Sequence, residues 1–497
     1  MQQFKLNNII LKIENLKKKQ KTIGLCHGVF DILHSGHINH FLEAKKNCDF
    51  LIVSITPSQY VKKGIGRPFY GDDERLKAIL NLKSVDFAFI NLWETAENTI
   101  LKLRPNFYFK GNDYINQQND ITKNLKKEIS AITKVKGKFI ITQSKLNSSS
   151  SLFNEKYDLN QKNFLKKVNN EIKDKYVFDI DQFKNKKVLI IGESIIDQYI
   201  FTEAIAKSGK DPILVNKIKS KLKIAGGILS VANNISNFVK KVDLVTYLGE
   251  FESETRFVKK KLSKNIKLNY FIKKNSPTII KTRYIDEYSN SKLIGFYNIN
   301  TDPISIDNEK YILKKIRNIK DYDTIIAIDY GHGLFTDRII RTITKSKKLC
   351  VNVQKNSFNS SFYRFDHFNK AFLISLQIGE FKFGLRQAGN IDNKLIEQFY
   401  NSNKYKFLSI THGKKGSQLY SSNHLVDCPA FTNEVKDRIG AGDNYFALLS
   451  LFLTNTSLIN FSILAASIAA SLSIQNFANI YKQKPEILFN SLKSLLK

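Results

Sequence analysis

The sequence has few cysteines, no long apolar run and a shortage of acidic residues. Its four cysteines, Cys26, Cys48, Cys350 and Cys428, lie far apart and form no C-x-x-C pair. This argues against a disulfide scaffold or a thiolate zinc site and fits a reducing cytosol. No run of about 18 apolar residues occurs, and the first residues lack the charged start and apolar core of a signal peptide. We therefore expect a cytoplasmic protein without membrane insertion.

Acidic residues are outnumbered, with 78 Lys and Arg against 45 Asp and Glu, for a net charge of +33. A chain this basic could bind nucleic acid or an anionic membrane surface. The lysines are scattered, however, in short runs such as Lys17–Lys19, Lys126-Lys127 and Lys259–Lys261. This pattern indicates a compositional bias with many solvated lysines. We expect no specific nucleic-acid partner, and attraction of phosphorylated substrates is the simpler interpretation.

The chain is long enough for more than one domain. Of its 497 residues, 42% are hydrophobic and 25% are charged, which is typical of folded proteins with sizeable cores. Short apolar segments alternate with helical patterns, which predicts parallel sheets with right-handed crossovers. We predict two tandem α/β domains at residues 1–152 and 187–497, joined by a 153–186 linker that carries a helix at Phe164–Ile172.

Periodicity places the main elements of both domains. For the first domain it predicts helices within residues 1–20 and at Gly36–Asn47 and Asp73–Leu82. The strands of that domain are predicted at Lys21–His27, Asp49–Thr56, Asp86–Asn91 and Phe107–Phe109. For the second domain it predicts buried strands at Lys187–Gly192, Asp323–Asp329, Phe372–Ser375 and Phe407–Thr411.

A histidine-rich turn follows the first strand. Gly28 can turn the chain there without a Cβ clash. His34, Gly36 and His37 then begin a helix, whose unpaired backbone amides point at an incoming anion. Two imidazoles three residues apart project to the same side of the turn. They could hydrogen-bond the charge that develops on a nucleotide α-phosphate and on its leaving pyrophosphate.

Other interpretations of these histidines remain open. His34, His37 and His40 could be metal ligands on a helix face, although His40 lies on a different side and lacks a nearby acidic partner at suitable spacing. They could also be ordinary surface or core histidines, although four of the eight histidines fall within fourteen residues.

The first domain resembles the cytidylyltransferase-like nucleotidyltransferases over residues 21 to about 152. His34-Ser35-Gly36-His37 is similar to their H-x-G-H signature, and Gly28-Val29-Phe30-Asp31 is similar to the segment before it. Further motifs follow in the family's order: Lys62-Lys63-Gly64 with Gly66-Arg67-Pro68, Asp73-Glu74-Arg75, Lys110-Gly111-Asn112-Asp113-Tyr114 and Ser148-Ser149-Ser150.

This resemblance implies a Rossmann-like fold and in-line attack of a substrate phosphate on the α-phosphorus of ATP or CTP, usually with Mg²⁺. No covalent enzyme intermediate is implied, so catalysis rests on positioning and charge stabilisation by His34 and His37. The resemblance assigns these residues to the nucleotide: Gly28, Phe30, Lys62, Lys63, Arg67, Lys110, Asp113, Ser148, Ser149 and Ser150. Which of the two lysines acts is left open.

A glycine-rich turn enters a helix late in the chain, at Gly440-Ala441-Gly442-Asp443. Successive backbone N–H groups there form an anion cradle, to which the helix dipole adds favourable potential. An Asp in the first turn of a helix is also favourable for structural reasons alone, and short glycine motifs recur by chance. By itself, the turn leaves both interpretations open.

From about residue 186 to its end the chain resembles the ribokinase-like (PfkB) sugar kinases. The matching motifs are Gly192–Asp197, Ala225–Asn234, Asp329–Gly333, Thr411–Gly416 and Gly440–Asp443. The resemblance implies an α/β domain with a small β lid, in which ATP and Mg²⁺ serve to phosphorylate a sugar. It makes Asp443 the general base and lets the amides of Gly440, Ala441 and Gly442 stabilise the transferring phosphoryl group. It assigns the sugar to Asp197, Gly226, Gly227, Asn233 and Asp329, and the nucleotide to Glu380, Thr411, Gly413 and Gly416.

Two positions depart from the PfkB pattern. The acidic motif N-x-x-E reads Gln377-Ile378-Gly379-Glu380, so Glu380 is expected to organise the metal only indirectly, through water. The usual D-P-K strand end reads Asn352-Val353-Gln354, which loses a carboxylate. A weakened kinase is compatible with these changes.

The two resemblances together indicate a bifunctional sugar kinase and sugar-phosphate nucleotidyltransferase that makes an NDP-activated sugar. The arrangement is similar to the bifunctional heptose-phosphate kinases and heptose-1-phosphate adenylyltransferases of lipopolysaccharide synthesis, with the order of the halves inverted. This implies an ADP-heptose-like product for a surface polysaccharide or lipopolysaccharide. Two alternatives stay open. Only one half could be active while the other regulates, or the chain could be a basic nucleic-acid or anionic-surface binder that retains the folds.

The expected partners are a sugar or sugar phosphate and nucleoside triphosphates. Segments Pro212–Ile218 and Thr278–Ile285 are predicted to form the lid, which pairs between subunits in many ribokinase-like proteins. We therefore expect a homodimer through the kinase lid.

Overall fold

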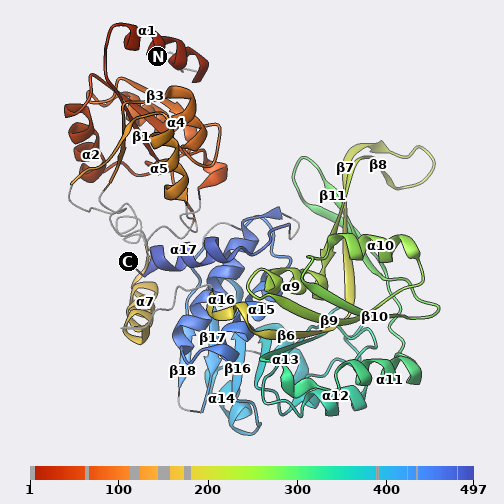
Figure 1. The fold of residues 1–497 in the computed structure, drawn as a ribbon. Coiled ribbons are helices and arrows are strands. Elements are labelled where there is room, and N and C mark those ends of the chain that lie inside the picture. Colours follow the sequence, from red (N-terminus) through yellow and green to blue (C-terminus); the bar gives the residue numbers. More distant parts are fainter. Residues whose placement is uncertain are drawn as a thin grey trace. The chain divides into compact units, whose positions relative to one another are not determined.

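The computed structural model describes residues 6–61, 66–111, 124–143, 157–172, 181–387, 389, 391–422, 424–432, 435–477 and 480–496. The chain divides into an N-terminal unit, Met1–Asp158 with Phe489–Lys497, and a C-terminal unit, Leu159–Leu488 (Figure 1). Both units are α/β structures, which confirms the predicted fold class. The predicted domain borders at 152 and 187 remain predictions. Within the ranges above, no helix is both long and apolar enough to cross a membrane.

The N-terminal unit is built on a five-stranded parallel sheet in the order β3-β2-β1-β4-β5. Its strands are β1 (Ile23–Gly28), β2 (Phe50–Ile55), β3 (Phe87–Ile90), β4 (Phe107–Lys110) and β5 (Lys138–Ile141). The strand order reverses between β1 and β4. Ligands of open parallel sheets bind at such a switch point, beyond the carboxyl ends of the strands. This edge is where Gly28 ends β1 and Lys110 ends β4.

Helices cover both faces of this sheet because its strands are apolar on both sides. Residues of α1 (Leu6–Lys18), α4 (Glu97–Leu103) and α5 (Asn124–Lys134) share one hydrophobic cluster. Residues of α2 (Ser35–Lys46) and α3 (Asp72–Leu80) share the cluster on the other face. The predicted strands and helices of this domain begin and end within about two residues of observed elements, apart from the wider range given for the N-terminal helix. The sequence pattern gave no prediction for α4, α5 and β5.

The C-terminal unit contains a nine-stranded sheet in the order β10-β9-β6-β13-β14-β15-β16-β17-β18. Its parallel strands are β6 (Lys187–Gly192), β9 (Lys241–Leu248), β10 (Ile266–Ile272), β13 (Thr324–Asp329), β14 (Leu349–Val353), β15 (Leu373–Gln377) and β16 (Phe407–Thr411). Strands β17 (Ser417–Tyr420) and β18 (Leu425–Cys428) continue it antiparallel. The four buried strands predicted for this domain are all present.

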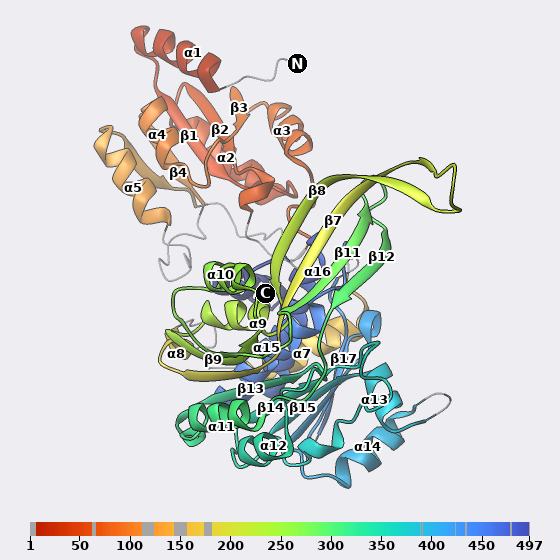
Figure 2. The ribbon, with the colours of Figure 1, turned by 90° about the vertical axis from the view of Figure 1, so that its right-hand side faces the viewer.

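Helices also cover both faces of the large sheet (Figure 2). One face carries α9 (Gly227–Ser236), α15 (Ala441–Asn455) and α16 (Ile459–Ile474), and the other carries α11 (Ile306–Lys315), α12 (Asp337–Ile343) and α13 (Ile378–Gly384). Apart from α7, which is described below, the other helices of eight or more residues in the described part of this unit are α10 (Glu252–Lys261), α14 (Asn393–Asn401) and α17 (Pro485–Leu495). The last of these extends into the residues grouped with the other unit. Helices α15 and α16 are almost wholly buried, which explains the apolar runs seen near the end of the sequence.

A separate four-stranded sheet, in the order β12-β11-β7-β8, forms the lid. It consists of β7 (Ser194–Lys207), β8 (Leu214–Gly226), β11 (Ile279–Asp286) and β12 (Lys292–Asn298), and it extends away from the large sheet (Figure 2). The two predicted lid segments fall on β8 and β11. The motif Gly192–Asp197 covers only the start of β7, whose outer half is exposed and lacks an apolar signal.

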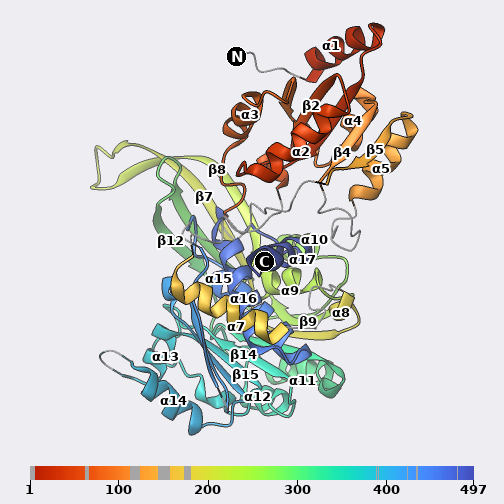
Figure 3. The same cartoon turned by 90° about the vertical axis from the view of Figure 1, so that its left-hand side faces the viewer.

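Helix α7 (Leu159–Ile172) covers the predicted linker helix and extends further toward the N-terminus. It lies beside α16 (Figure 3). The Glu171 carboxylate accepts the backbone amides of Asn460 (3.1 Å) and Phe461 (2.8 Å) at the start of α16. An acidic side chain stabilises the N-terminus of a helix, so α7 is held on the C-terminal unit. Further along, α8 (Asp181–Lys184) is a single short turn before β6.

Candidate active sites

His34 caps the helix that carries the second histidine of the motif. It is the N-cap of α2, and its Nδ1 accepts the backbone N–H of Gly36 at 3.1 Å. A neutral imidazole that accepts at Nδ1 carries its proton on Nε2. The donor of the His34 ring is therefore its Nε2–H group, at the N-terminus of α2, where an anion is favoured.

The two imidazoles of the motif lie on the same side of the turn. The rings of His34 and His37 stack with centroids 4.0 Å apart and planes 26° from parallel. Phe30, whose backbone takes a left-handed φ of 45°, packs against the His37 ring with centroids 5.5 Å apart. A Cβ on Gly28 would meet the Phe30 ring at 3.0 Å. The first strand thus ends in a small residue that makes room for the ring supporting His37.

Arg67 is tied to the loop that precedes the histidines. Its Nε lies 3.0 Å from Oδ2 of Asp31, and both side chains are almost fully buried. The other oxygen of Asp31 accepts the amides of Phe69 (2.7 Å) and Tyr70 (3.0 Å). In this arrangement Arg67 holds a loop, and its predicted contact with the nucleotide remains a prediction.

Arg75, named above only as part of the motif Asp73-Glu74-Arg75, holds several loops at the same edge of the sheet. It is 1% exposed and donates to the carbonyls of Val29 (2.6 Å) and Thr56 (2.9 Å). It also pairs with Asp72 at 2.6 Å. One buried guanidinium therefore fixes the loops after β1 and β2.

Lys110 ends β4 at the switch point but is turned into the fold. Its Nζ lies 3.1 Å from Oε2 of Glu128, and the side chains are 6% and 5% exposed. Glu128 also accepts the hydroxyl of Tyr108 at 2.9 Å and the amide of Ala96 at 3.0 Å. Although burial alone raises the pKa of Glu128, the Lys110 ammonium and these donors hold it below its usual value. The predicted contact of Lys110 with the nucleotide stays a prediction.

The metal interpretation of the histidines finds no support in the described part of the chain. Burial lowers the pKa of His40 to about 4, and its Nδ1 is hydrogen-bonded to Thr142 at 2.7 Å. Among the described residues, no group of three or more His, Cys, Asp or Glu is placed to hold a metal ion. The predicted site residues Lys62, Lys63, Asp113, Ser148, Ser149 and Ser150 lie outside the described residues.

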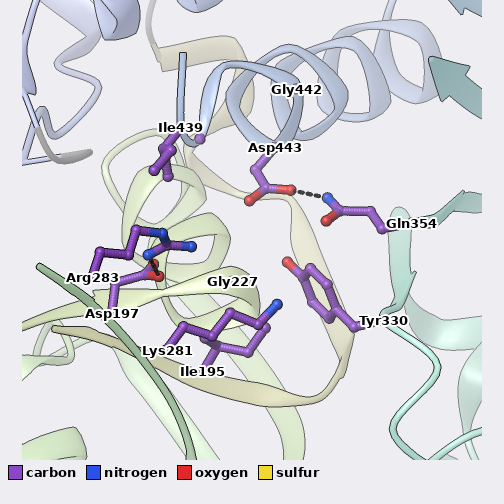
Figure 4. A pocket seen from close by; sticks show the side chains of 11 residues that line it. Ile195, Asp197, Gly227, Lys281, Arg283, Tyr330, Gln354, Ile439, Gly442 and Asp443 are labelled. Atoms are coloured by element: carbon purple, nitrogen blue, oxygen red, sulfur yellow. Dashed lines mark hydrogen bonds and ion pairs between the residues drawn. The ribbon is translucent and has the colours of Figure 1, made fainter. Parts of the chain in front are cut away.

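In the C-terminal unit, the lid, β13, β14 and the glycine-rich turn meet around a cavity of about 150 Å³ (Figure 4). Its lining is Ile195, Asp197, Gly227, Lys281, Arg283, Tyr330, Gln354, Ile439, Gly440, Gly442 and Asp443. Predicted sugar residues and the predicted base thus face one space. The structure brings together Asp197, Gly227, Gly440, Gly442 and Asp443 from parts of the chain that are nearly 250 residues apart.

Asp443 lies in the first turn of α15, after Gly440, whose left-handed φ of 80° caps the helix. Its Oδ1 accepts Nε2 of Gln354 at 2.6 Å (Figure 4). Burial raises the pKa of Asp443 to about 6, and the Gln354 hydrogen bond opposes this rise. A carboxylate in a cavity with a pKa near the working pH is suited to take a proton.

The opposite wall of the cavity carries two cations from the lid. Strands β7 and β11 run parallel and place Asp197 beside Lys281 and Tyr199 beside Arg283. Nη1 of Arg283 lies 2.6 Å from Oδ1 of Asp197. The Lys281 ammonium lies 5.7 Å from the centre of the Tyr330 ring, and burial lowers its pKa.

Sequence reasoning missed Lys281 and Arg283 as site residues. The sequence feature that could have identified them is their spacing. Two cations at alternate positions of a strand lie on the same face of the sheet. Tyr330 lay within a recognised motif without being chosen. Its hydroxyl is buried and has no hydrogen-bond partner among the described residues.

A second recess, of about 470 Å³, lies along the residues that precede the glycine-rich turn. It is lined by Lys292, Lys414, Val435, Lys436, Asp437 and Arg438. Lys414 belongs to the predicted nucleotide turn, where Gly413 and Gly416 both take left-handed backbone with φ of 60° and 100°. A Cβ on Gly416 would meet the carbonyl of Cys428 at 2.1 Å. The turn therefore needs glycine at this position.

Several predicted residues of the kinase domain lie outside both spaces. A Cβ on Gly226 would come within 2.0 Å of the Asp197 carboxylate, so this glycine makes room for Asp197. Asn233 accepts the amide of Ser263 at 2.9 Å and donates to the Lys261 carbonyl at 3.2 Å, which is a structural use. Asp329 accepts the amide of Gly331 at 2.8 Å. Their contacts with a sugar remain predictions, as does the contact of Thr411, the last residue of β16, with a nucleotide.

Two family models match the chain, one for each half. Residues 25–156 match the cytidylyltransferase-like family and residues 185–485 match the pfkB family of carbohydrate kinases. The chain is also similar to the bifunctional protein HldE of Helicobacter pylori, with 26% identity over 312 residues, 61% of this chain and 65% of that protein. With HldE of Haemophilus influenzae it shares 26% identity over 300 residues, 59% of this chain and 61% of that protein. The chain therefore spans less than two thirds of the length of these relatives.

Among solved structures, phosphofructokinase-2 of Escherichia coli with potassium superposes at a TM-score of 0.49 and 15% identity. The superposition covers 62% of this chain and 99% of that one.

Proposed function

Because this chain belongs to the pfkB family of carbohydrate kinases and carries a cytidylyltransferase-like domain ahead of the kinase domain, we propose that it is a bifunctional enzyme. Its C-terminal half phosphorylates a sugar with ATP, and its N-terminal half couples a sugar phosphate to a nucleotide with release of pyrophosphate. The observation that carries this proposal is the cavity shared by Asp443, the glycine-rich turn and Asp197.

In the kinase half, Asp443 takes the proton from the attacking hydroxyl. Backbone amides of Gly440 and Gly442 at the start of α15 stabilise the charge on the transferring phosphoryl group, as helix N-termini do for anions. The second recess, with Lys414 and Arg438, supplies positive charge for the remaining phosphates of ATP. The turn then holds the transferring group between acceptor and donor, as in-line transfer requires.

We propose that the acceptor is itself a sugar phosphate. A neutral sugar needs only hydrogen-bond partners for its hydroxyls, yet this cavity adds Lys281 and Arg283 from one face of β11. Guanidinium and ammonium groups are the usual partners of phosphate. The buried Tyr330 hydroxyl supplies one more donor. These groups support an anionic acceptor over a neutral one.

In the transferase half, His34 and His37 bind the phosphate that undergoes attack. We propose that the Nε2–H of His34, at the N-terminus of α2, donates to the negative charge that builds up between the α-phosphorus and the leaving pyrophosphate. The resulting product is an NDP-activated sugar. The bifunctional relatives support an ADP-heptose-like product for a surface polysaccharide or lipopolysaccharide.

Magnesium with ATP fits the residues around the kinase turn. The Glu380 carboxylate accepts the amides of Lys355 at 3.1 Å and Gln377 at 2.8 Å, and burial raises its pKa to about 7. A carboxylate so engaged suits a metal held through water, with the ion's other ligands coming from nucleotide phosphates. When bound, the ion neutralises charge on the phosphates. ATP or CTP is the proposed donor of the transferase half.

We further propose that the lid joins two copies of the chain. Strand β12 is the edge of the lid sheet, and all seven of its residues are exposed. They include Ile294 (55% exposed) and Phe296 (59%). An apolar edge strand of this kind invites pairing with another chain. The four cysteines, all buried and free, support action in the reducing cytoplasm.

The test is an assay of the purified full chain with each nucleoside triphosphate and a panel of sugars and sugar phosphates. We expect ADP release with a sugar phosphate and pyrophosphate release with a sugar 1-phosphate. Release of only one of the two would leave a single active half. Release of neither, together with salt-dependent DNA binding, would replace the proposal with the binding-protein alternative.

A further inference from the structure

We propose that Gln354 is a positioning residue that fixes the Asp443 carboxylate for proton removal, a role that no sequence motif of the kinase domain assigns to it. This inference rests on the proposed kinase function. Gln354 follows β14 directly, and its Nε2 donates to Oδ1 of Asp443 at 2.6 Å. Both residues line the cavity (Figure 4).

Hydrogen bonds hold the backbone of Gln354 in place, and this fixes the position of its Cα. Its N–H donates to the carbonyl of Asp329 at 2.9 Å. Its carbonyl accepts Nδ2 of Asn359 at 2.8 Å. Asn359 in turn accepts the amide of Asn356 at 2.8 Å. The loop after β14 is thereby locked, and the carboxamide reaches Asp443 from a rigid support.

A single donor on one carboxylate oxygen separates the roles of the two oxygens. Oδ1 is occupied by Gln354, while Oδ2 points away from Gln354 (Figure 4) and keeps its lone pairs for a substrate hydroxyl. A carboxamide can do this without adding charge, so the base keeps its full negative charge for the transfer. Charge-assisted hydrogen bonds of this kind also favour the ionised form of the acid.

The other charged groups around Asp443 shift its pKa in opposite directions. Asp197 on β7 raises the pKa of Asp443, and Lys281 on β11 lowers it. Glu380 on α13 and Tyr330 after β13 also lie within electrostatic reach, since Asp443 raises the pKa of each. Burial makes the largest contribution and raises the value to about 6. Of these groups, Gln354 makes the direct hydrogen bond, so its loss moves the ionisation of Asp443 upward.

The test compares the dependence of kcat on pH for ADP release in full-length Gln354→Leu, Gln354→Lys and the wild type. Leucine keeps the volume and removes the donor, so we expect the acidic limb to move up by about one pH unit and kcat at pH 6 to fall about fivefold. Lysine restores a donor and adds charge, so we expect the limb to move below that of the wild type. The KM for ATP stays within about twofold in both. Gln398→Leu, on the exposed side of α14, is the matched control and leaves the profile unchanged.

A residue that only supports the fold would lower kcat equally at every pH, and that result, or an unmoved limb in both variants, overturns the proposal. A second readout does not depend on turnover. The carboxyl ¹³C resonance of Asp443, assigned by its loss in Asp443→Asn, should titrate at higher pH in Gln354→Leu than in the wild type. If the wild type releases no ADP with any acceptor, the proposed function fails, and the titration still decides the role of Gln354.

Discussion

Arg283 and Asp197 form an ion pair across adjacent lid strands, with Nη1 of Arg283 2.6 Å from Oδ1 of Asp197. Asp197 is the acid expected to bind sugar hydroxyls, so this pair carries a guanidinium into the acceptor site. Arg283 also lies over the rings of Tyr199 and Tyr297, 5.6 Å and 5.7 Å from their centres. Lys281 is its neighbour on the same face of β11. Under the proposed function, these lid residues favour an anionic acceptor.

Replacing Lys281 by methionine should weaken binding of a phosphorylated acceptor specifically. Loss of one charge-assisted contact predicts a KM for the sugar phosphate about 10- to 100-fold higher, with the KM for ATP little changed. Steady-state kinetics of ADP release measure both constants. Lys314→Met, on the basic end of α11, is the matched control. Equal use of the dephosphorylated sugar by the wild type would contradict an anionic acceptor.

Asp443→Asn should abolish ADP release and also stabilise the fold at alkaline pH. The pKa of Asp443 is raised from 3.8 to about 6 in the folded protein, so the native state binds this proton more tightly than the unfolded chain. Its contribution to stability therefore falls as pH rises from about 4 to 6, and the penalty is complete above that range. Asp443→Asn has no carboxyl to ionise, so it does not lose this stability as the pH rises.

The expected gain in the free energy of unfolding of Asp443→Asn at pH 8 is on the order of 1–3 kcal/mol. It should vanish near pH 3, below both pKa values, where the wild-type carboxyl is mostly protonated in both states. Denaturant unfolding at the two pH values measures it. If Asp443→Asn is less stable than the wild type at pH 8, the ionised Asp443 carboxylate does not destabilise the folded protein.

How much of this site the sequence predicts depends on how local each signal is. Gly440 and Asp443 belong to one short motif and were placed correctly as a helix start. Lys281 reaches the site only because β11 pairs in parallel with β7. This pairing places Lys281 beside Asp197, which lies 84 residues earlier in the sequence. No local pattern reports that pairing. The site's cations were therefore missing from the motif-based prediction.

The same distinction holds for the fold. Strand β16 was predicted at its observed bounds, Phe407–Thr411, because a buried parallel strand is a short apolar run between turns. The outer half of β7 has exposed residues such as Glu203 and Ile205, whose conformation comes from pairing with β8 rather than from burial. Asn233, a motif residue predicted to contact the sugar, also holds the loop at Ser263, a contact that the motif does not report.

His37→Ala should cut pyrophosphate release by about a hundredfold or more, the scale of a lost oxyanion donor. The ring of His37 stacks on His34, so its removal takes away a donor and the support of the second imidazole. Assays of pyrophosphate in samples quenched at successive times measure the rate of its release. His424→Ala, at an exposed position of the other unit, is the control. An unchanged rate would remove His37 from the site.

Phe296→Glu should convert a lid-paired dimer into a monomer. Phe296 is 59% exposed on the edge strand β12, and a charge there opposes strand addition. Light scattering with size-exclusion chromatography reports the mass of the wild type and the variant. Phe362→Glu, 55% exposed and outside the lid, should leave the mass unchanged. A monomeric wild type would contradict the pairing.

The most direct measurement follows both products of one reaction mixture by ³¹P NMR. Full-length wild type, Asp443→Asn and His37→Ala are each incubated with nucleoside triphosphate, Mg²⁺ and the acceptor sugar phosphate. We expect a bisphosphorylated sugar and ADP from the wild type and from His37→Ala, and neither from Asp443→Asn. When the matching sugar 1-phosphate is supplied instead, Asp443→Asn should still form the diphosphate linkage of an NDP-sugar and His37→Ala should not. Loss of both reactions in either single variant, in a protein that remains folded, would contradict two independent phosphate-binding centres on one chain.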